Sequence, residues 1–315
     1  MNRLSDSAAI DVHQHLWPPS LLEALRARHR PPRLHGWTLE LEGEPVYPID
    51  SRHHDVDVRG EQVIADGLDL ALISLSSPLG IELLPAAEGA ELLDAYHEGT
   101  AALGRPFGAW AAASLADPDP DALASRLAEG FVGLQLPANA LSHELDYARA
   151  APLLEALETA GRPLLIHPGP ASVPRDVPPW WPAIVSYVQQ MHEAWYAFGA
   201  FGRRRHPRLR VCFAMLAGLA PLHGERFHTR AGRRTVVDEN VYLDISSYGT
   251  RAIDATVRVL GIDALVEGSD RPYAEPVLAD LGAAAQAAIR GANPVRLLDH
   301  KEVSNDLAVA SGAQS

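Results

Sequence analysis

The histidines closest to the N-terminus have a spacing that suits metal binding. His13 and His15 belong to the run Asp11-Val12-His13-Gln14-His15, which follows the apolar residues 8–10. Side chains alternate between the faces of a strand, so both imidazoles of a His-x-His pair lie on one face and can chelate one metal ion. Two histidines in a polar turn would give the same pattern. Other ligands in the chain must decide between these explanations.

Two further polar residues end apolar runs. His167 ends the run from Pro163, and Asp270 ends the run from Ala264. Each has an ordinary alternative, because His167 can end a strand at a turn and Asp270 can cap the following helix. Their value as ligands therefore depends on the fold that brings these run ends together.

The elements that must position these residues alternate between apolar strands and helical segments. Apolar runs predict eight strands, the first ending in the His-x-His pair and the others at 68–76, 107–114, 131–137, 163–167, 209–216, 241–247 and 264–270. Helices are predicted at 19–28, 87–104, 119–129, 147–161, 181–205, 219–230, 250–260, 276–290 and 294–298.

This alternation indicates an α/β fold. Repeated strand–helix units with nearly continuous apolar strands predict a parallel sheet covered by helices, and eight units predict a closed (β/α)8 TIM barrel. A doubly wound open sheet is the alternative, but no Gly-x-Gly-x-x-Gly follows the first strand. We expect residues 1–300 to form a single barrel domain. Within it, 16–60 is a long loop of lid or binding type, and 301–315 is a loosely ordered tail.

In such a barrel the C-terminal ends of the strands form one mouth, where catalytic groups gather. His13, His15, His167 and Asp270 would all stand there. Three imidazoles and one carboxylate suit a single divalent ion with an open position for water. We expect Zn²⁺, with Mn²⁺ as the alternative.

Composition restricts the classes of partner. The net charge of −13 argues against nucleic acid and against anionic membrane surfaces. A lone cysteine, Cys212, allows no internal disulfide, which fits the cytoplasm, and we find neither a signal peptide nor an apolar run long enough to span a bilayer. The only lysine is Lys301, so the body of the chain offers no Schiff-base lysine and no lysine-derived bridging ligand. A single-metal centre acting on a small-molecule substrate is therefore favoured.

The order of these motifs resembles amidohydrolase family 2, the group that includes aminocarboxymuconate-semialdehyde decarboxylase and related hydrolases and lactonases. The resemblance covers nearly the whole chain. It rests on residues 11–15, on Gly161-Arg-Pro-Leu-Leu-Ile-His167, on Gly268-Ser-Asp-Arg-Pro272 and on the closing segment 291–298. It implies an amidohydrolase-like barrel in which His13, His15, His167 and Asp270 bind the metal and Asp270 also handles protons.

The same resemblance suggests residues that bind substrate. Arg226 matches a family arginine that helps to bind a substrate carboxylate, sometimes across a dimer interface, so a homodimer is expected. Arg59 stands where the decarboxylase-like members often have an arginine. Trp181 lies after the fifth strand, where an aromatic side chain could form a wall for an apolar substrate. Surface or packing roles would explain all three equally well.

One position departs from the family pattern. Met215 stands where the family has an active-site histidine after the sixth strand, and a thioether cannot transfer a proton. A nearby histidine could replace the missing one, with His223, His192, His228 and His54 as candidates. His223 is the first choice because it lies on the loop that leaves this strand. Alternatively the reaction needs only a metal-activated water and Asp270, or the barrel has lost catalysis and kept its metal.

Three functions remain open at this point. The first is a metal-dependent hydrolase that attacks a small amide, ester or lactone with a metal-activated water, with Asp270 and His223 as proton-transfer groups. The second is non-oxidative decarboxylation of an aromatic or unsaturated acid, against which Met215 counts. The third is a catalytically degenerate metal-binding barrel. Metal without turnover would distinguish the third from the other two.

Overall fold

The computed structural model describes residues 8–233, 237–276 and 281–298. Within these residues, parallel strands lie at all eight predicted places: β1 (Ile10–Gln14), β5 (Leu70–Ile73), β6 (Phe107–Ala109), β7 (Leu134–Pro137), β8 (Leu164–His167), β9 (Val211–Phe213), β10 (Val241–Asp244) and β11 (Leu265–Val266). The predicted tail at 301–315 lies outside the described residues.

These strands close into one barrel. They pair in the orders β1-β5-β6 and β11-β10-β9-β8-β7. Backbone hydrogen bonds connect the two sheets on both sides: Ala111 N donates to Gly133 O at 2.9 Å, and Val12 N donates to Glu267 O at 2.8 Å. A barrel has no free edge, so the open doubly wound sheet is excluded and the predicted (β/α)8 barrel is confirmed.

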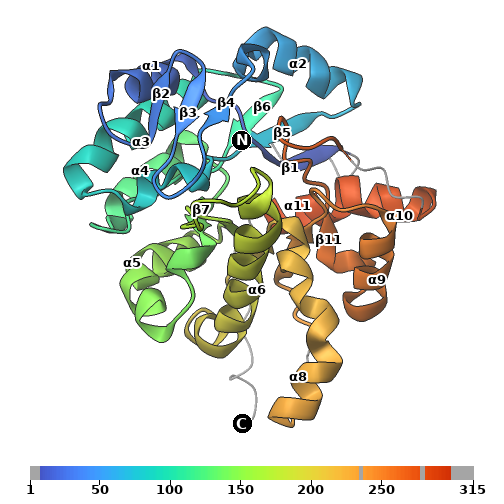
Figure 1. Ribbon diagram of the computed structural model, residues 1–315. Coiled ribbons are helices and arrows are strands. Elements are labelled where there is room, and N and C mark those ends of the chain that lie inside the picture. The colour runs from blue at the N-terminus through green and yellow to red at the C-terminus, as the bar shows by residue number, and fades with distance from the viewer. Residues whose placement is uncertain (1–7, 234–236, 277–280, 299–315) are drawn as a thin grey trace, which may run out of the picture.

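The helices surround the strands (Figure 1). They are α1 (Pro19–Ala27), α2 (Val56–Ala65), α3 (Ala86–Ala101), α4 (Pro120–Glu129), α5 (Glu144–Ala160), α6 (Tyr187–Ala197), α7 (Arg203–Arg205), α8 (Gly224–Ala231), α9 (Thr250–Leu260), α10 (Ala283–Ala287) and α11 (Asn293–Leu298). Asp119 begins α4 by accepting the N–H groups of Asp121 and Ala122, and Gly161 ends α5 in the left-handed conformation. No helix of the described ranges is long and apolar enough to cross a membrane.

Short 3-10 and π segments complete the chain at η1 (Ser51–His54), η2 (Ser77–Leu79), η3 (Ile81–Leu83), η4 (Ala138–Ala140), η5 (Pro182–Ser186), η6 (Phe198–Gly202), η7 (Met215–His223), η8 (Ile262–Ala264) and η9 (Ala288–Ala292). The predicted long helix at 181–205 is therefore a continuous run in which η5 and η6 are π turns. The predicted helix at 276–290 is described only in part, because residues 277–280 lie outside the described ranges.

Several expectations differ from the structure, among them the bounds of the predicted strands and of the helix at 219–230, where α8 begins only at Gly224. The strand predicted at 209–216 ends at Phe213, because the backbone turns left-handed from Met215 onward. The segment 16–60 contains the first half of α2 and a small antiparallel sheet, β2 (Arg33–His35), β3 (Thr38–Glu40) and β4 (Tyr47–Pro48), none of which was predicted. Strands of two or three residues are too short to show an alternating pattern in the sequence.

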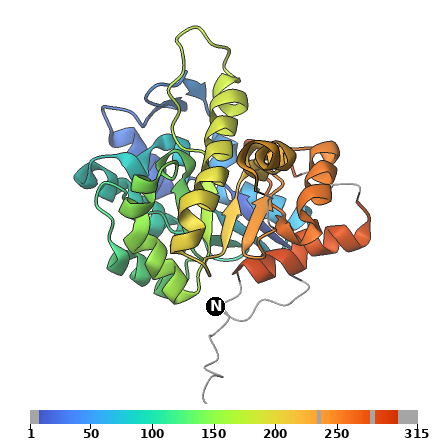
Figure 2. The ribbon, with the colours of Figure 1, turned by 90° about the horizontal axis from the view of Figure 1, so that it is seen from below.

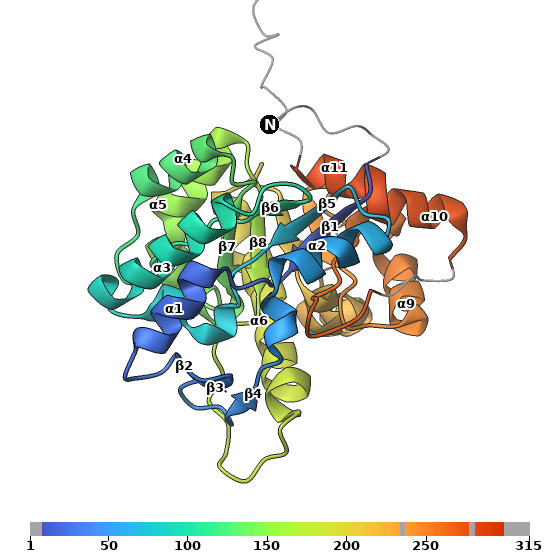
Figure 3. The same cartoon turned by 90° about the horizontal axis from the view of Figure 1, so that it is seen from above.

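The barrel interior has an apolar base and a polar mouth. Its base is filled by a separate buried cluster that includes Val12, Trp110 and Cys212 and is closed by Leu297 and Leu298 of α11. The small sheet and the yellow-green segment that follows β8 lie together at the opposite end (Figures 2 and 3). The C-terminal mouth is therefore the covered end of the barrel.

The cover is held together by backbone contacts. Val173 N donates to Gly43 O at 3.1 Å. Gly43 has a φ of +80°, and a Cβ there would lie 2.9 Å from Ala171 O. Both features require glycine at position 43, so the small sheet can approach the segment after β8 closely at this point.

Candidate metal centre

His13 of β1 and His15, the residue after β1, both point into the barrel because the strand is irregular. Its pairing with β5 shifts between Asp11 and Gln14, which gives β1 one more residue than its neighbour over this stretch. Val12 packs in the barrel interior, so strict alternation would turn His13 outward. The extra residue breaks the alternation, and both His13 and His15 end in the interior with less than 2% of their surface exposed.

The hydrogen bonds of His15 and His167 determine which ring nitrogen is free. Nδ1 of His15 lies 3.0 Å from the carbonyl oxygen of Ser74, and Nδ1 of His167 lies 2.8 Å from the carbonyl oxygen of Pro168. A carbonyl only accepts, so Nδ1 must donate in both rings. In the neutral imidazole this leaves a lone pair on Nε2.

A carboxylate that the sequence analysis missed holds the third ring. Oδ2 of Asp244 lies 2.8 Å from His13 Nδ1, and both side chains are fully buried. The other oxygen, Oδ1, accepts the backbone N–H groups of Met215 at 2.9 Å and Ser246 at 3.0 Å. Asp244 is the last residue of β10. The strand was predicted to continue to residue 247, so Asp244 did not mark a predicted strand end, and a carboxylate within an apolar run was the available signal.

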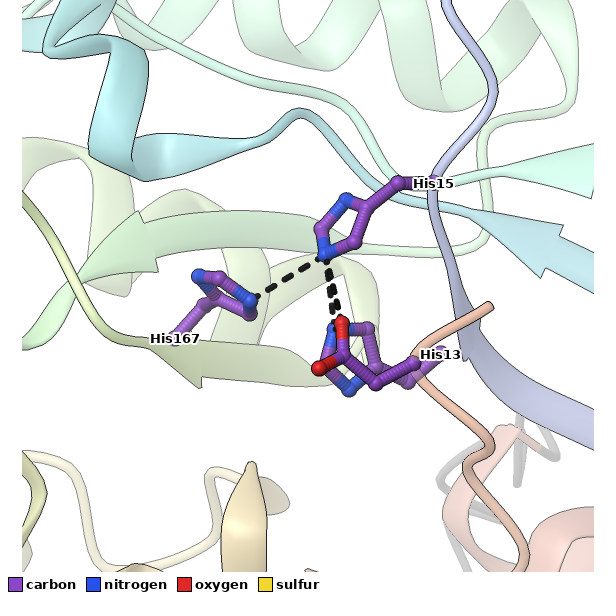
Figure 4. A group of neighbouring side chains, drawn as sticks. His13, His15 and His167 are labelled. Carbon is purple, nitrogen blue, oxygen red and sulfur yellow. Dashed lines mark hydrogen bonds and ion pairs between the residues drawn. The ribbon is translucent and has the colours of Figure 1, made fainter. Parts of the chain in front are cut away.

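The three Nε2 atoms converge on one point. His13 Nε2 lies 3.1 Å from His15 Nε2, which lies 3.2 Å from His167 Nε2, and the three rings point toward one another in Figure 4. Lone pairs at this separation repel unless a cation or a proton lies between them. Carbonyl acceptors already take up the Nδ1 protons of two rings, so the arrangement fits a metal ion that accepts all three lone pairs.

Asp270 completes the group. Its Oδ1 lies 3.2 Å from His15 Nε2 and 3.6 Å from His13 Nε2, and the ligand atoms of all four side chains lie within 4.8 Å of one another. Asp270 has a left-handed backbone, with φ of 61°, and its N–H donates to His13 O at 2.9 Å. An aspartate tolerates this conformation better than most residues. The structure thus brings together the four residues that the sequence indicated as ligands.

Protonation also bears on the metal. Burial opposes a charge on His13, but the neighbouring carboxylates, Asp244 first, outweigh it and raise the pKa of His13 to about 9. Burial lowers the pKa of His15 and lowers that of His167 further. Two rings are thus neutral donors at pH 7, whereas a metal ion must displace the proton of the third. The donor set of imidazoles and carboxylate suits a divalent ion such as Zn²⁺ or Mn²⁺.

A pocket opens from this group toward the small sheet. Its volume is about 420 Å³, and His15, His167 and Asp270 form its polar end. The rest of the wall is largely apolar and aromatic and comes from both covering segments, with Leu39 and Tyr47 on one side and Tyr187 and Val188 on the other. A single polar end in an apolar pocket is typical of a small-molecule site.

Solved structures with this architecture are known. IDCase from Metarhizium anisopliae matches with a TM-score of 0.77 and 22% identity over 92% of this chain and 97% of that chain. 5-Carboxyvanillate decarboxylase from Sphingomonas paucimobilis matches with a TM-score of 0.72 and 20% identity over 93% of this chain and 99% of that chain. A structure of an amidohydrolase II matches with a TM-score of 0.72 and 19% identity over 92% of this chain and 99% of that chain. The chain has the amidohydrolase 2 fold. No protein-family model and no curated protein matches its sequence.

Met215 occupies a strained position in this barrel. Met215, Leu216, Ala217, Gly218 and Leu219 have φ values between 47° and 61°, which makes η7 begin as a left-handed turn. Each non-glycine residue in this conformation costs roughly 1–2 kcal/mol. The turn lies against α6 and places Met215 in the pocket wall. An apolar side chain therefore occupies the place where the resemblance implies a histidine.

The other predicted site residues lie outside the pocket wall. His223 is exposed and its ring contacts that of His192 at 5.0 Å, and Arg226 is exposed on α8. Trp181 is half-buried beside Trp180, while Pro182 and Ile184 of the same segment line the pocket.

Arg59 is buried and binds neighbouring parts of the chain. It is almost fully buried, and its Nη1 donates to the carbonyl oxygens of His15 at 2.6 Å and His53 at 2.9 Å. Its Nη2 donates to Gln14 Oε1 at 2.7 Å. The guanidinium thus holds the end of β1 from behind and does not line the pocket.

Proposed function

We propose that this protein is a metal-dependent, non-oxidative decarboxylase of a small aromatic acid. The observation that carries the proposal is the position of Asp270, whose carboxyl group lies against the converging imidazoles and also lines an apolar pocket. Structures of the same fold support this choice, since several are decarboxylases of aromatic acids. One of them, the 5-carboxyvanillate decarboxylase from Novosphingobium aromaticivorans, has manganese bound together with a nitrobenzoic acid.

The metal ligands would be Nε2 of His13, His15 and His167 and Oδ1 of Asp270. A divalent ion bound there supplies positive charge that holds the acid group of the substrate and stabilises developing negative charge. The fold neighbours favour Mn²⁺, and the imidazole-rich donor set accepts Zn²⁺ equally well.

Asp270 would deliver the proton that decarboxylation requires. When the bond between the ring and the carboxylate breaks, carbon dioxide leaves and the electron pair stays on the ring carbon, which must gain one proton. Among the described residues, Asp270 is the only carboxyl group in the pocket wall. Met215 cannot take part in proton transfer, so Asp270 acts alone as the acid and recovers its proton from solvent after product release.

The apolar walls would orient the ring and exclude water. Trp17, Leu79 and Val188 line the pocket, and Trp17 is held in place because its Nε1 donates to Ser76 Oγ at 2.9 Å. A ring packed between such side chains keeps its carboxylate at the polar end beside Asp270. Exclusion of water strengthens the interaction between that carboxylate and the bound cation.

Metal-dependent hydrolysis of a small amide, ester or lactone is the second candidate, and Met215 favours it. Hydrolysis needs one group that accepts a proton from the attacking water and returns it to the leaving group, and Asp270 alone could do both. The same pocket would then hold an uncharged substrate whose carbonyl group lies at the polar end.

Carbon dioxide release distinguishes the candidates. Protein loaded with Mn²⁺ or Zn²⁺ to about one equivalent should release carbon dioxide from at least one member of a panel of hydroxybenzoic acids. Asp270→Asn should reduce the rate of carbon dioxide release at least about 100-fold, because a general acid contributes at least this factor to the rate. The metal content of the variant is measured in parallel. Hydrolysis of esters or lactones without any carbon dioxide release would favour the second candidate. If only Met215→His is active, the natural barrel is a degenerate metal-binding protein.

A further inference from the structure

We infer that the pocket selects acids that carry a single negative charge and an apolar substituent, and that it rejects diacids. This inference rests on the proposed function for one point only, the position of the substrate carboxylate at the metal centre. It concerns the remainder of the substrate, which must occupy the pocket between the metal centre and the small sheet.

The charges of the wall are the first argument. Neither arginine nor lysine lines the pocket among the described residues, and Asp270 is the carboxyl group at its polar end. The buried arginine nearest to the ligands is engaged elsewhere, since Arg59 binds two backbone carbonyl groups and Gln14. Arg271, which follows Asp270, pairs with Asp66 at 3.0 Å and with Glu275 at 2.9 Å. Within the part of the chain that the structure describes, a bound metal would therefore be the only cation that faces a substrate.

Among the described residues, the phenol groups of the pocket wall beside the small sheet already have an acceptor. The hydroxyl groups of Tyr47 and Tyr187 both donate to the carboxylate of Glu44, at 3.1 Å and 2.9 Å. Ala171 N donates to the same carboxylate at 3.1 Å. The two tyrosines thus present their rings to the pocket, and the carboxyl group behind them would repel a second anion.

The energetic consequence follows from desolvation. A carboxylate that leaves water for an apolar wall without a partner is destabilised by several kcal/mol. An alkyl group in the same place gains from burial. At about 0.8 kcal/mol per methylene, each added carbon should strengthen binding about fourfold until the pocket is full.

The available space agrees with an extended substrate. The volume of about 420 Å³ is within the range of pockets that hold drug-sized ligands. Beyond the metal centre, the pocket wall also includes Leu41, Ile49 and Ile184. Ile184 is 63% exposed and lies at the outer opening of the pocket. An apolar substituent can therefore follow apolar contacts from the metal centre to the mouth.

Binding measurements test the inference without requiring turnover. Isothermal titration of the Mn²⁺-loaded protein would compare 2-hydroxybenzoates that carry a methyl, ethyl or propyl group at carbon 4 with 2-hydroxyterephthalate, which has a carboxylate there. We expect affinity to rise about fourfold per carbon and the diacid to bind at least about 100-fold more weakly than the ethyl compound. Equal affinity for the diacid, or a flat alkyl series, would overturn the inference.

A positive charge placed at the outer end of the pocket should reduce the preference for alkyl acids over the diacid. Ile184→Lys puts a cation beside the far end of the pocket and should strengthen diacid binding at least tenfold while it weakens propyl binding. Val185→Lys is the matched control, because Val185 is the next residue, is 36% exposed and does not line the pocket. It should leave both affinities unchanged. Equal effects of the two variants would mean that the general charge, not the pocket, determines selection.

The remaining outcomes separate this inference from the proposed function. If the alkyl acids bind with the predicted preference but release no carbon dioxide, the inference stands and the proposed reaction fails. If the diacid is decarboxylated as efficiently as the ethyl compound, the reaction stands and the inference fails. If the diacid binds tightly and Arg226→Ala removes that binding, a second copy of the chain supplies the cation, and the inference is again overturned.

Discussion

At the scale of single residues, the orientation of His13 depends on one buried carboxylate. Asp244 accepts from His13 Nδ1 and leaves Nε2 free for a metal ion. Its other oxygen is held by the N–H groups of Met215 and Ser246. Asp244 is therefore a positioning residue that acts through a ligand.

Asp244→Asn should reverse this orientation. The amide oxygen would stay with the two backbone donors, so the amide NH₂ would face Nδ1 and make it an acceptor. The proton would then lie on Nε2, where it blocks the metal. We expect metal affinity, measured by titration of the metal-free protein with Mn²⁺, to fall about 10- to 100-fold. Ser246→Ala removes only the hydrogen bond that the Ser246 hydroxyl donates to Oδ1 of Asp244, keeps the backbone N–H bond, and should change the affinity less than threefold.

At the scale of elements, the left-handed turn after β9 is the most demanding local structure of the site. It packs against α6, where a Cβ at Gly218 would lie 2.5 Å from the carbonyl oxygen of Val188. Four of the five residues of the turn are not glycine, so tertiary contacts must hold the turn in place. Its stability thus determines where Met215 lies.

Gly218→Ala should destabilise the protein by about 2–5 kcal/mol. The left-handed conformation contributes roughly 1–2 kcal/mol, and the collision with Val188 contributes the rest. Gly232→Ala is the matched control, because Gly232 has a φ of +65° but no atom within 4 Å of its Cβ position. It should lose only about 1 kcal/mol in urea unfolding. A similar loss in both variants would contradict close packing of the turn on α6.

The segment between β5 and α3 contains a buried acid that the site does not use. Glu82 is fully buried; its Oε1 accepts from Ser77 Oγ, and its Oε2 has no partner among the described residues. Burial raises the pKa of Glu82 to about 7 in the folded protein, above its value of 4.5 in the unfolded chain. The folded state therefore holds this proton more tightly than the unfolded state, so stability is lost as the pH rises from about 4.5 to about 7.

Glu82→Gln should remove this dependence, because the amide does not ionise. We compare the free energy of unfolding in urea of the variant and of the natural protein. The difference between them should grow in favour of the variant by about 2–3 kcal/mol as the pH rises from 5 to 8. A constant difference across that range would show that Glu82 titrates normally in the folded protein.

At the scale of the whole molecule, the candidate metal centre connects residues from both sheets of the barrel. His13 lies in β1 and His15 directly follows it, His167 ends β8, and Asp270 follows β11. A cation bound to all four ligands would stabilise the closed barrel and not merely one strand. It would also relieve the repulsion among the Nε2 atoms.

Removal of the metal should therefore lower the melting temperature of the whole barrel. A site saturated at 100 times its Kd contributes about 2.7 kcal/mol to the free energy of unfolding. Dialysis against a chelator followed by addition of Mn²⁺ should lower and then restore the melting temperature. The melting temperature of His15→Ala should change neither on dialysis against the chelator nor on addition of Mn²⁺. A melting temperature that ignores the metal in the natural protein would contradict the assignment of these ligands.

The sequence by itself determined the barrel and indicated its four candidate ligands. Both depend on local patterns: apolar runs mark the strands, and polar residues at their ends mark the mouth. The resemblance to amidohydrolase family 2 added the expectation of a histidine at position 215 and exposed its absence.

Only the tertiary structure decided how these residues are used. Asp244 lies 231 positions from the histidine that it holds, the bulge in β1 depends on the pairing with β5, and the left-handed turn depends on contact with α6. The charge of the pocket wall likewise depends on side chains from many segments. The tertiary structure also decided that Arg59 binds backbone carbonyl groups and that His223 lies at the surface. Such features arise from contacts between distant parts of the chain, and no local pattern in the sequence records them.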